Sequence, residues 1–193
     1  MKAQQPDLEL TENTKEISII STIDISTPLG PMIAGATTEG ICFLEFNDRI
    51  RLEKEFLDLK KLLNAVMKPG RNEHLNQLET ELAEYFEGKR KTFSVPLHTP
   101  GNDFSRAVWQ SLQQIPYGTT CTYKEQADQM NNPKAIRAIA STNGRNRLAI
   151  IIPCHRVIGS NGSMTGYAGG IDKKKWLLKF ERSHSEVPAG SLF

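Results

Sequence analysis

The apolar residues change their pattern near residue 100, and this change limits the possible folds more than any other feature. Before it, apolar runs at 17–27, 31–40 and 41–48 are typical of β-strands. The Thr-Glu-Gly at 38–40 predicts a hairpin turn between the last two of them. After residue 100 the apolar residues recur mostly at helical spacing. The first half therefore favours a sheet and the second half a set of helices.

A stretch with Pro, Gly and Asn at 98–102 separates the two halves and is typical of a linker. A chain of 193 residues fits one or two domains. We therefore expect an α+β fold with an N-terminal domain over 1–100 and a C-terminal domain over 101–193.

Two helices and one more strand are expected in the first half. An apolar stripe at helical spacing precedes Pro69 and Gly70, which end it. A second stripe runs from Leu75 to Phe86, and 92–95 predicts a short strand. The first stripe consists of Leu52, Phe56, Leu59, Leu63 and Val66.

The second half predicts a helix-turn-helix. A first helix carries Phe104, Val108, Leu112 and Ile115, and a short helix is expected over 123–130. Asn132 and Pro133 then suit the cap and first position of another helix. That helix would turn Ala135, Ile136, Ile139 and Ala140 inward and Arg137 to another face. Two short helices joined by a tight turn resemble a DNA-binding motif, and an ordinary helical hairpin is the alternative.

The charge is divided unequally along the chain. Residues 1–100 hold 12 Lys and Arg against 16 Asp and Glu, whereas 101–193 hold 12 against 6. A basic C-terminal half beside an acidic N-terminal half indicates that the former meets a polyanion such as DNA. No apolar run approaches the ~20 residues that a membrane-spanning helix needs, so no membrane partner is expected.

The three cysteines, Cys42, Cys121 and Cys154, are too few and too scattered for a disulfide scaffold or a four-cysteine zinc module. We expect Cys42 and Cys121 to pack in the interior. The polar N-terminus over 1–16 does not resemble a secretory signal. A reduced, cytoplasmic protein is the simplest interpretation.

The segment over 148–158 carries the chemistry. Its apolar run, 148–152, predicts a buried strand that ends at Pro153, so Cys154 and His155 would lie at the strand end. A thiol must lose its proton before it attacks, and an imidazole held by a carboxylate can accept that proton. The candidate carboxylates are Asp172, Glu181 and Glu186. The alternative is a buried structural thiol beside an exposed histidine.

The Pro-Cys-His-Arg-Val at 153–157 is followed by Gly-Tyr-Ala-Gly-Gly at 166–170 and Trp-Leu-Leu at 176–178. Together these motifs closely resemble the bacterial methylated-DNA–protein-cysteine methyltransferases, the 6-O-alkylguanine-DNA alkyltransferases. The resemblance runs from about 104 to 181 and is weaker at 27–30 and 41–45. It implies a ribonuclease-H-like N-terminal α/β domain, followed by a mainly helical, winged-helix-like domain with a helix-turn-helix.

The resemblance also implies a catalytic set. Cys154 would attack the alkyl carbon on the guanine oxygen, and His155 would take the thiol proton through a water. Glu181 would orient His155, and Asn146 would order the site through hydrogen bonds.

A second set would contact DNA. By the same resemblance, Tyr123 hydrogen-bonds the base and Arg137 fills the gap that the base leaves. The carbonyl of Val157 accepts from the exocyclic amine. Tyr167 packs by the alkyl group, and the backbone N–H of Ala168 meets the oxygen.

No cofactor and no metal are expected. Some family members bind zinc in the N-terminal half, but Cys42, His74 and His98 show no convergence in the sequence. The chain lacks the prolines that some members carry after the residue matching Asn146, and it has Ala168 where some have serine.

The resemblance therefore implies direct-reversal DNA repair. One methyl group would move from 6-O-methylguanine, and less well from 4-O-methylthymine, in double-stranded DNA to Cys154. Each monomer would act once, because a thioether does not hydrolyse readily. Two alternatives stay open: an alkyltransferase-like binding module, whose members replace the cysteine, and a Cys-His hydrolase or thiol redox enzyme.

Overall fold

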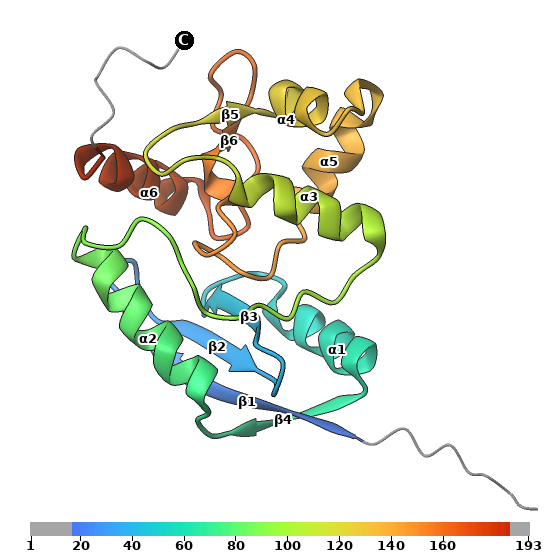
Figure 1. Cartoon of the computed structure of the whole chain (residues 1–193), viewed down its shortest axis with the longest axis vertical. Helices are drawn as coiled ribbons and strands as arrows, with labels where there is room; N and C mark the ends of the chain where they lie inside the picture. The colour runs from blue at the N-terminus through green and yellow to red at the C-terminus, as the bar shows by residue number, and fades with distance from the viewer. Residues whose placement is uncertain (1–16, 186–193) are drawn as a thin grey trace, which may run out of the picture.

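A computed structural model describes residues 17–185. A sheet with two helices forms the lower half of Figure 1, and a mainly helical half lies above it. The predicted α+β class is confirmed. The polar stretch over 1–16 and the carboxylate candidate Glu186 lie outside the described residues. Within 17–185 no helix combines the length and apolar character that crossing a bilayer requires.

The N-terminal half is built on a four-stranded mixed sheet of order β3-β2-β1-β4. Strands β1 (Ser18–Ile25), β2 (Met32–Ala36) and β3 (Ile41–Phe46) pair antiparallel. The hairpin predicted at 38–40 is confirmed, and it brings β3, buried at every position, to the side that faces the second half.

The prediction that the helical stripe continues to Val66 is wrong. Helix α1 (Leu52–Leu63) ends at Asn64, which adopts a left-handed conformation with φ 48°, and Val66 lies in strand β4 (Ala65–Pro69). Asn tolerates this conformation, so the chain turns and pairs β4 parallel to β1.

The strand predicted over 92–95 is absent from the described residues. The amide groups of Ser94 and Val95 donate instead to the Glu81 carboxylate, at 2.9 and 3.3 Å. Glu81 belongs to helix α2 (Glu73–Phe86), which covers the sheet with Leu75, Leu78 and Leu82. A side-chain acceptor thus replaces the ladder that a strand would need.

The C-terminal half is mainly helical, as predicted. It contains α3 (Asp103–Gln113), α4 (Tyr123–Gln129), α5 (Ile136–Asn143) and α6 (Ile171–Ser183). Strands β5 (Cys121–Thr122) and β6 (Val157–Ile158) form a short parallel pair beside them. Thr122 and Glu125 form a capping box that begins α4.

Helices α4 and α5 pack together and place α5 on the upper right in Figure 1. Pro133–Ala135 forms a 3-10 turn between the two helices, directly before α5, and Asn132 makes no side-chain cap. Ile139 is buried, but Ile136 is exposed, so its predicted inward position is wrong. The tighter winding of the 3-10 turn changes the phase of the residues at its end.

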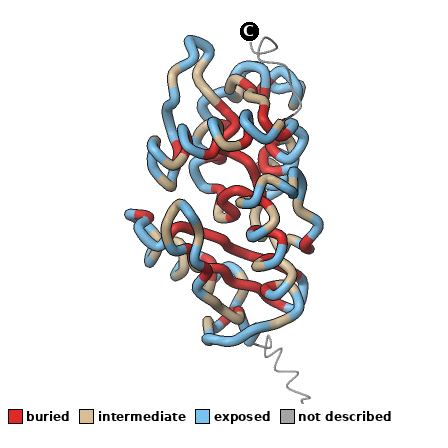
Figure 2. Tube along the Cα trace, turned by 90° about the vertical axis from the view of Figure 1, so that its left-hand side faces the viewer, coloured by how far each residue is buried: buried red, intermediate tan, exposed pale blue. Residues whose placement is uncertain are grey.

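The predicted strand over 148–152 is also wrong. Leu148 forms a single bridge with Leu44, and the chain then turns with Ile152 N bonded to Leu148 O at 3.0 Å. Ile150 has φ 71° within this turn. The segment is buried, as predicted, because its apolar side chains fill the core between the two halves, where Figure 2 shows buried chain. An apolar run without period identifies burial but not strand geometry.

Candidate active site

Cys154 begins a 3-10 turn over Cys154–Arg156, directly after the buried loop. Its side chain is nearly buried, with 8% of the residue exposed. The Asn146 amide donates to Cys154 Sγ at 3.2 Å and to Ile152 O at 2.8 Å, and its oxygen accepts from Leu148 N at 3.0 Å. Burial raises the pKa of the Cys154 thiol, while the hydrogen bond from Asn146 lowers it. The resting sulfur is therefore protonated and needs a base.

A candidate base, His155, follows Cys154 in the chain and is fully buried. His155 Nε2 lies 2.8 Å from Glu181 Oε1, and both side chains are buried, so an exposed His155 is excluded. Burial lowers the pKa of His155 even though Glu181 raises it. An ionised carboxylate only accepts hydrogen bonds, so Nε2 carries the proton and Nδ1 keeps a free lone pair. Nδ1 has no hydrogen-bond partner among residues 17–185.

Glu181 collects donors from both halves of the molecule. Arg156 Nε and Nη2 donate to it at 2.8 and 2.9 Å, and Gly118 N donates at 3.2 Å. The Tyr85 hydroxyl donates at 2.8 Å from helix α2. Burial by itself raises the pKa of Glu181, but His155 and Arg156 outweigh it and hold the pKa well below its ordinary value. Glu181 is thus an ionised anchor for His155.

Lys174 organises the opposite side of the site. Its side chain is fully buried, and Nζ donates to Val157 O at 2.6 Å and to Thr165 O at 3.1 Å. Thr165 O also accepts from the Tyr123 hydroxyl at 3.3 Å. Lys174 was not expected in the site, yet it shares one face of α6 with Leu177 and Glu181, a spacing that could have revealed it.

Of the remaining predicted residues, Tyr167 lies within the site, whereas Arg137 and Ala168 lie on the surface. The buried Tyr167 ring stands edge-on to the His155 ring, with centroids 6.3 Å apart. Ala168 is exposed and lines a cavity of 260 Å³ beside Ile50. Arg137 is exposed on α5. The structure therefore brings Cys154, His155, Asn146, Glu181, Val157, Tyr123 and Tyr167 together and leaves Arg137 and Ala168 outside.

Two functional residues that the sequence did not indicate come from the N-terminal half. Tyr85 contacts Glu181 across 96 residues, and Arg49 donates to Asn146 O across 97. No local pattern signals such contacts. Arg156 was inside the quoted motif without a role, although its buried side chain holds Glu181 and the Ile115 carbonyl.

The residues considered for a metal have protein partners. Cys42 Sγ donates to Gly35 O at 3.4 Å, and His98 Nδ1 lies 2.9 Å from Thr37 Oγ1. His74 Nε2 lies 3.2 Å from Thr38 O. The described part of the chain contains no group of three or more His, Cys, Asp or Glu with a metal-binding arrangement.

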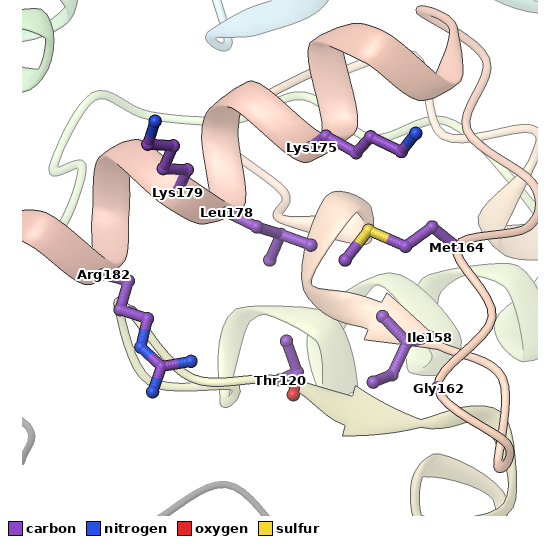
Figure 3. A pocket seen from close by; sticks show the side chains of 9 residues that line it. Thr120, Ile158, Gly162, Met164, Lys175, Leu178, Lys179 and Arg182 are labelled. Carbon is purple, nitrogen blue, oxygen red and sulfur yellow. The ribbon is translucent and has the colours of Figure 1, made fainter. Parts of the chain in front are cut away.

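A cavity of 340 Å³ lies elsewhere, between α6 and the β5–β6 pair. Figure 3 shows an apolar floor with Ile158, Met164 and Leu178, and basic side chains of α6 around it. Gly118, whose N–H donates to Glu181, lines it, but Cys154, His155 and Glu181 do not. We therefore assign the chemistry to the buried cluster around Cys154 and not to this cavity.

Comparison with known proteins finds matches over most of the chain. Residues 21–99 match the family model of the 6-O-methylguanine DNA methyltransferase ribonuclease-like domain, and 103–183 match that of its DNA-binding domain. A methylated-DNA–protein-cysteine methyltransferase of Methanosarcina barkeri is 42% identical over 83% of this chain and 96% of its own. A constitutive one of Bacillus subtilis is 41% identical over 81% and 92%. The crystal structure of the Mycobacterium tuberculosis protein in complex with DNA has a TM-score of 0.71 at 37% identity, over 89% and 96%.

Proposed function

The chain belongs to the 6-O-methylguanine DNA methyltransferase family. From this premise we propose that the sulfur of Cys154 receives the methyl group in direct-reversal DNA repair. The chain is a methylated-DNA–protein-cysteine methyltransferase, like its relatives. The observation that supports Cys154 is its contact with the Asn146 amide beside the buried His155–Glu181 pair.

The reaction needs a thiolate at the moment of transfer. His155 Nδ1 accepts the thiol proton, directly or through a water, and Glu181 stabilises the imidazolium that forms. Cys154 sulfur then attacks the methyl carbon in line with the bond to guanine O6. The new C–S bond forms as the C–O bond breaks, and the electron pair leaves on the base, which takes up a proton.

The sulfur meets its target only after the base leaves the helix. O6 of guanine is inside the stacked duplex, and Cys154 is nearly buried, so the nucleotide must be extruded into the site. Arg137 on the exposed face of α5 fills the gap in the stack, and the Tyr123 hydroxyl meets the base. The carbonyl of Val157 keeps one lone pair for the exocyclic amine, because Lys174 uses the other.

Methyl transfer inactivates the protein molecule that carries it out. A thioether does not hydrolyse under cellular conditions, so each protein molecule acts only once, as a cytoplasmic monomer on double-stranded DNA with alkylated bases. 4-O-methylthymine is the poorer substrate. We place the domain boundary between 100 and 101, with the lesion bound by the second domain.

The test is the mass of the intact protein after incubation with a duplex that carries one labelled 6-O-methylguanine. The expected result is the gain of one methyl group on the peptide with Cys154 and no label on Cys154→Ser. Label on the Cys154→Ser variant would reject the assignment.

The same experiment separates the alternatives. A binding module would hold the duplex without gaining mass. A Cys-His hydrolase would turn over many times on an ester without DNA, and its mass would return to the starting value.

A further inference from the structure

The N-terminal half reaches the loop around Asn146 with a single guanidinium group. Arg49, in the turn after β3, donates from Nη1 to Asn146 O at 3.2 Å and from Nη2 to Gly144 O at 3.4 Å. Its side chain is 4% exposed. A buried arginine with two carbonyl acceptors is held in one geometry by its planar fork.

These two carbonyls have different roles. Gly144 caps the C-terminal end of α5, the helix that presents Arg137 to DNA. Asn146 carries the amide that contacts Cys154 Sγ. A cation beside the end of a helix also interacts favourably with the carbonyl dipoles there. One side chain therefore joins the end of the DNA-contacting helix to the group that contacts the sulfur.

The backbone of β3 secures the same loop. Leu44 N donates to Arg147 O at 2.8 Å, and Ala149 N donates to Leu44 O at 2.9 Å. Asn146 is thus fixed on its C-terminal side by strand β3 and on its N-terminal side by Arg49. Only a few residues lie between the hydrogen bonds from Arg49 and those from strand β3, so the loop around Asn146 does not move independently of the N-terminal half.

We propose that Arg49 is a positioning residue for methyl transfer, which holds the Asn146 amide against the Cys154 sulfur and ties it to the end of α5. This role depends on the proposed function of Cys154. It gives the N-terminal half a part in the reaction itself, through hydrogen bonds to the carbonyls of Asn146 and Gly144.

Two carboxylates hold Arg49 in place. Its Nη1 contacts the buried carboxylate of Glu45, and its Nη2 lies 2.6 Å from Glu55 Oε1. Burial by itself lowers the pKa of Arg49, but Glu45 and Glu55 raise it, so the guanidinium stays charged. Lysine cannot reproduce this arrangement, because a single ammonium group does not reach two carbonyls and two carboxylates at once.

The charged groups around the sulfur allow the effect of Arg49 to be measured on the pKa of the Cys154 thiol. Apart from burial and Asn146, the pKa of the Cys154 thiol is raised by Glu45 and lowered by Lys174 and Arg49. The phenols of Tyr123 and Tyr167 also face the sulfur, and His155 and Glu181 form the base on the other side. Arg49 and Glu45 thus act in opposite directions on the same atom.

The experiment measures two quantities on Arg49→Met, Arg49→Lys and Glu45→Gln. One is the single-turnover methyl-transfer rate at saturating lesion duplex. The other is the pH dependence of iodoacetamide alkylation at Cys154 without DNA, read by peptide mass. Arg71→Met is the matched control, because Arg71 makes an exposed ion pair with Glu79 in the same half.

Arg49→Met is expected to transfer methyl about tenfold more slowly and to move the Cys154 alkylation midpoint to higher pH. Arg49→Lys should slow transfer with a smaller shift of the midpoint, and Glu45→Gln should move the midpoint to lower pH. If Arg49 and Glu45 had a purely structural role, Arg49→Met and Glu45→Gln would shift the alkylation midpoint in the same direction or not at all. Arg71→Met should behave as the wild type.

Wild-type transfer rates and alkylation midpoints in Arg49→Met and Glu45→Gln would overturn the proposal. If Arg49→Met does not fold, the opposed shifts of Arg49→Lys and Glu45→Gln decide. If the wild type itself gains no methyl, the proposed function fails instead, and the alkylation data still report on Arg49.

Discussion

The hydroxyl of Tyr85, on helix α2, donates a hydrogen bond of 2.8 Å to Glu181 Oε1, on helix α6. The N-terminal half therefore holds the carboxylate that orients His155, just as Arg49 holds the loop that contains Asn146. The ribonuclease-like half reaches both sides of the Cys154 site, and its removal would disturb both.

Tyr85→Phe is expected to destabilise the fold by about 1.5–3 kcal/mol, because it removes a buried hydrogen bond to a charged acceptor. Chemical denaturation measures this loss. Tyr117→Phe is the matched control, since the buried Tyr117 hydroxyl has no hydrogen-bond partner among the described residues. Equal losses in the two variants would contradict the importance of the Tyr85–Glu181 bond.

The methyl-transfer rate should stay constant down to pH 6.5 and fall only at lower pH. Burial lowers the pKa of His155 below its ordinary value of 6.5, so the imidazole stays neutral and basic above it. Glu181, with its lowered pKa, remains ionised throughout this range. Single-turnover rates at a series of pH values measure the profile, with the exposed His184→Asn as control. Burial raises the pKa of Glu45 to about 8, so Glu45→Gln is measured as well. A rate that falls already between pH 8 and pH 7 in both the wild type and Glu45→Gln would contradict a depressed His155 pKa.

The same burial makes acid destabilise the protein. A histidine whose folded pKa is depressed contributes stability above its unfolded pKa of 6.5, and this contribution is lost as the pH falls through the folded value. Thermal unfolding of His155→Asn should therefore depend less on pH below 6.5 than that of the wild type. Parallel pH curves for the wild type and His155→Asn would show that another group causes the loss of stability in acid.

Lys174→Met should slow methyl transfer by about tenfold or more, because the Val157 and Thr165 carbonyls lose the ammonium group that fixes them beside the base. Lys175→Met is the control, since the neighbouring lysine is exposed. Transfer rates on a lesion duplex compare the two. Similar rates in both variants would remove Lys174 from the site.

Arg137→Ala should slow transfer from duplex DNA while leaving transfer from an unpaired lesion in a single strand nearly unchanged. Arg137 lies exposed on α5 and contributes to extrusion of the base rather than to the chemistry. Its loss should change stability by no more than about 0.5 kcal/mol, as for most surface positions. Equal slowing on both substrates would place Arg137 at the reaction and not at extrusion.

Short-range patterns predicted much of the fold. The strands before residue 47 and helices α2, α3, α4 and α6 follow apolar spacing and turn residues that lie within a few positions of one another. The motif around Cys154 likewise predicted His155, Asn146 and Glu181 through its resemblance to a known family. Asn146 contacts Cys154 and His155 contacts Glu181, and the roles of these four residues in the reaction stay predictions.

Errors occurred where local patterns allow two structures. Val66 continues a helical stripe but pairs in β4, and 148–152 has the composition of a strand but forms buried turns. An apolar run indicates burial but does not distinguish a strand from a helix or a turn. Only the hydrogen-bonding and packing partners available in the folded chain decide between these structures.

The sequence by itself determined a sheet-rich half and a helical half, and it predicted Cys154 as the reactive residue, because each depends on neighbouring residues. Only the tertiary structure decided that Tyr85 and Arg49 support the site. Contacts of this kind join residues tens of positions apart. They arise because packing the two halves together excludes water from polar groups, which must then find partners wherever the chain brings them.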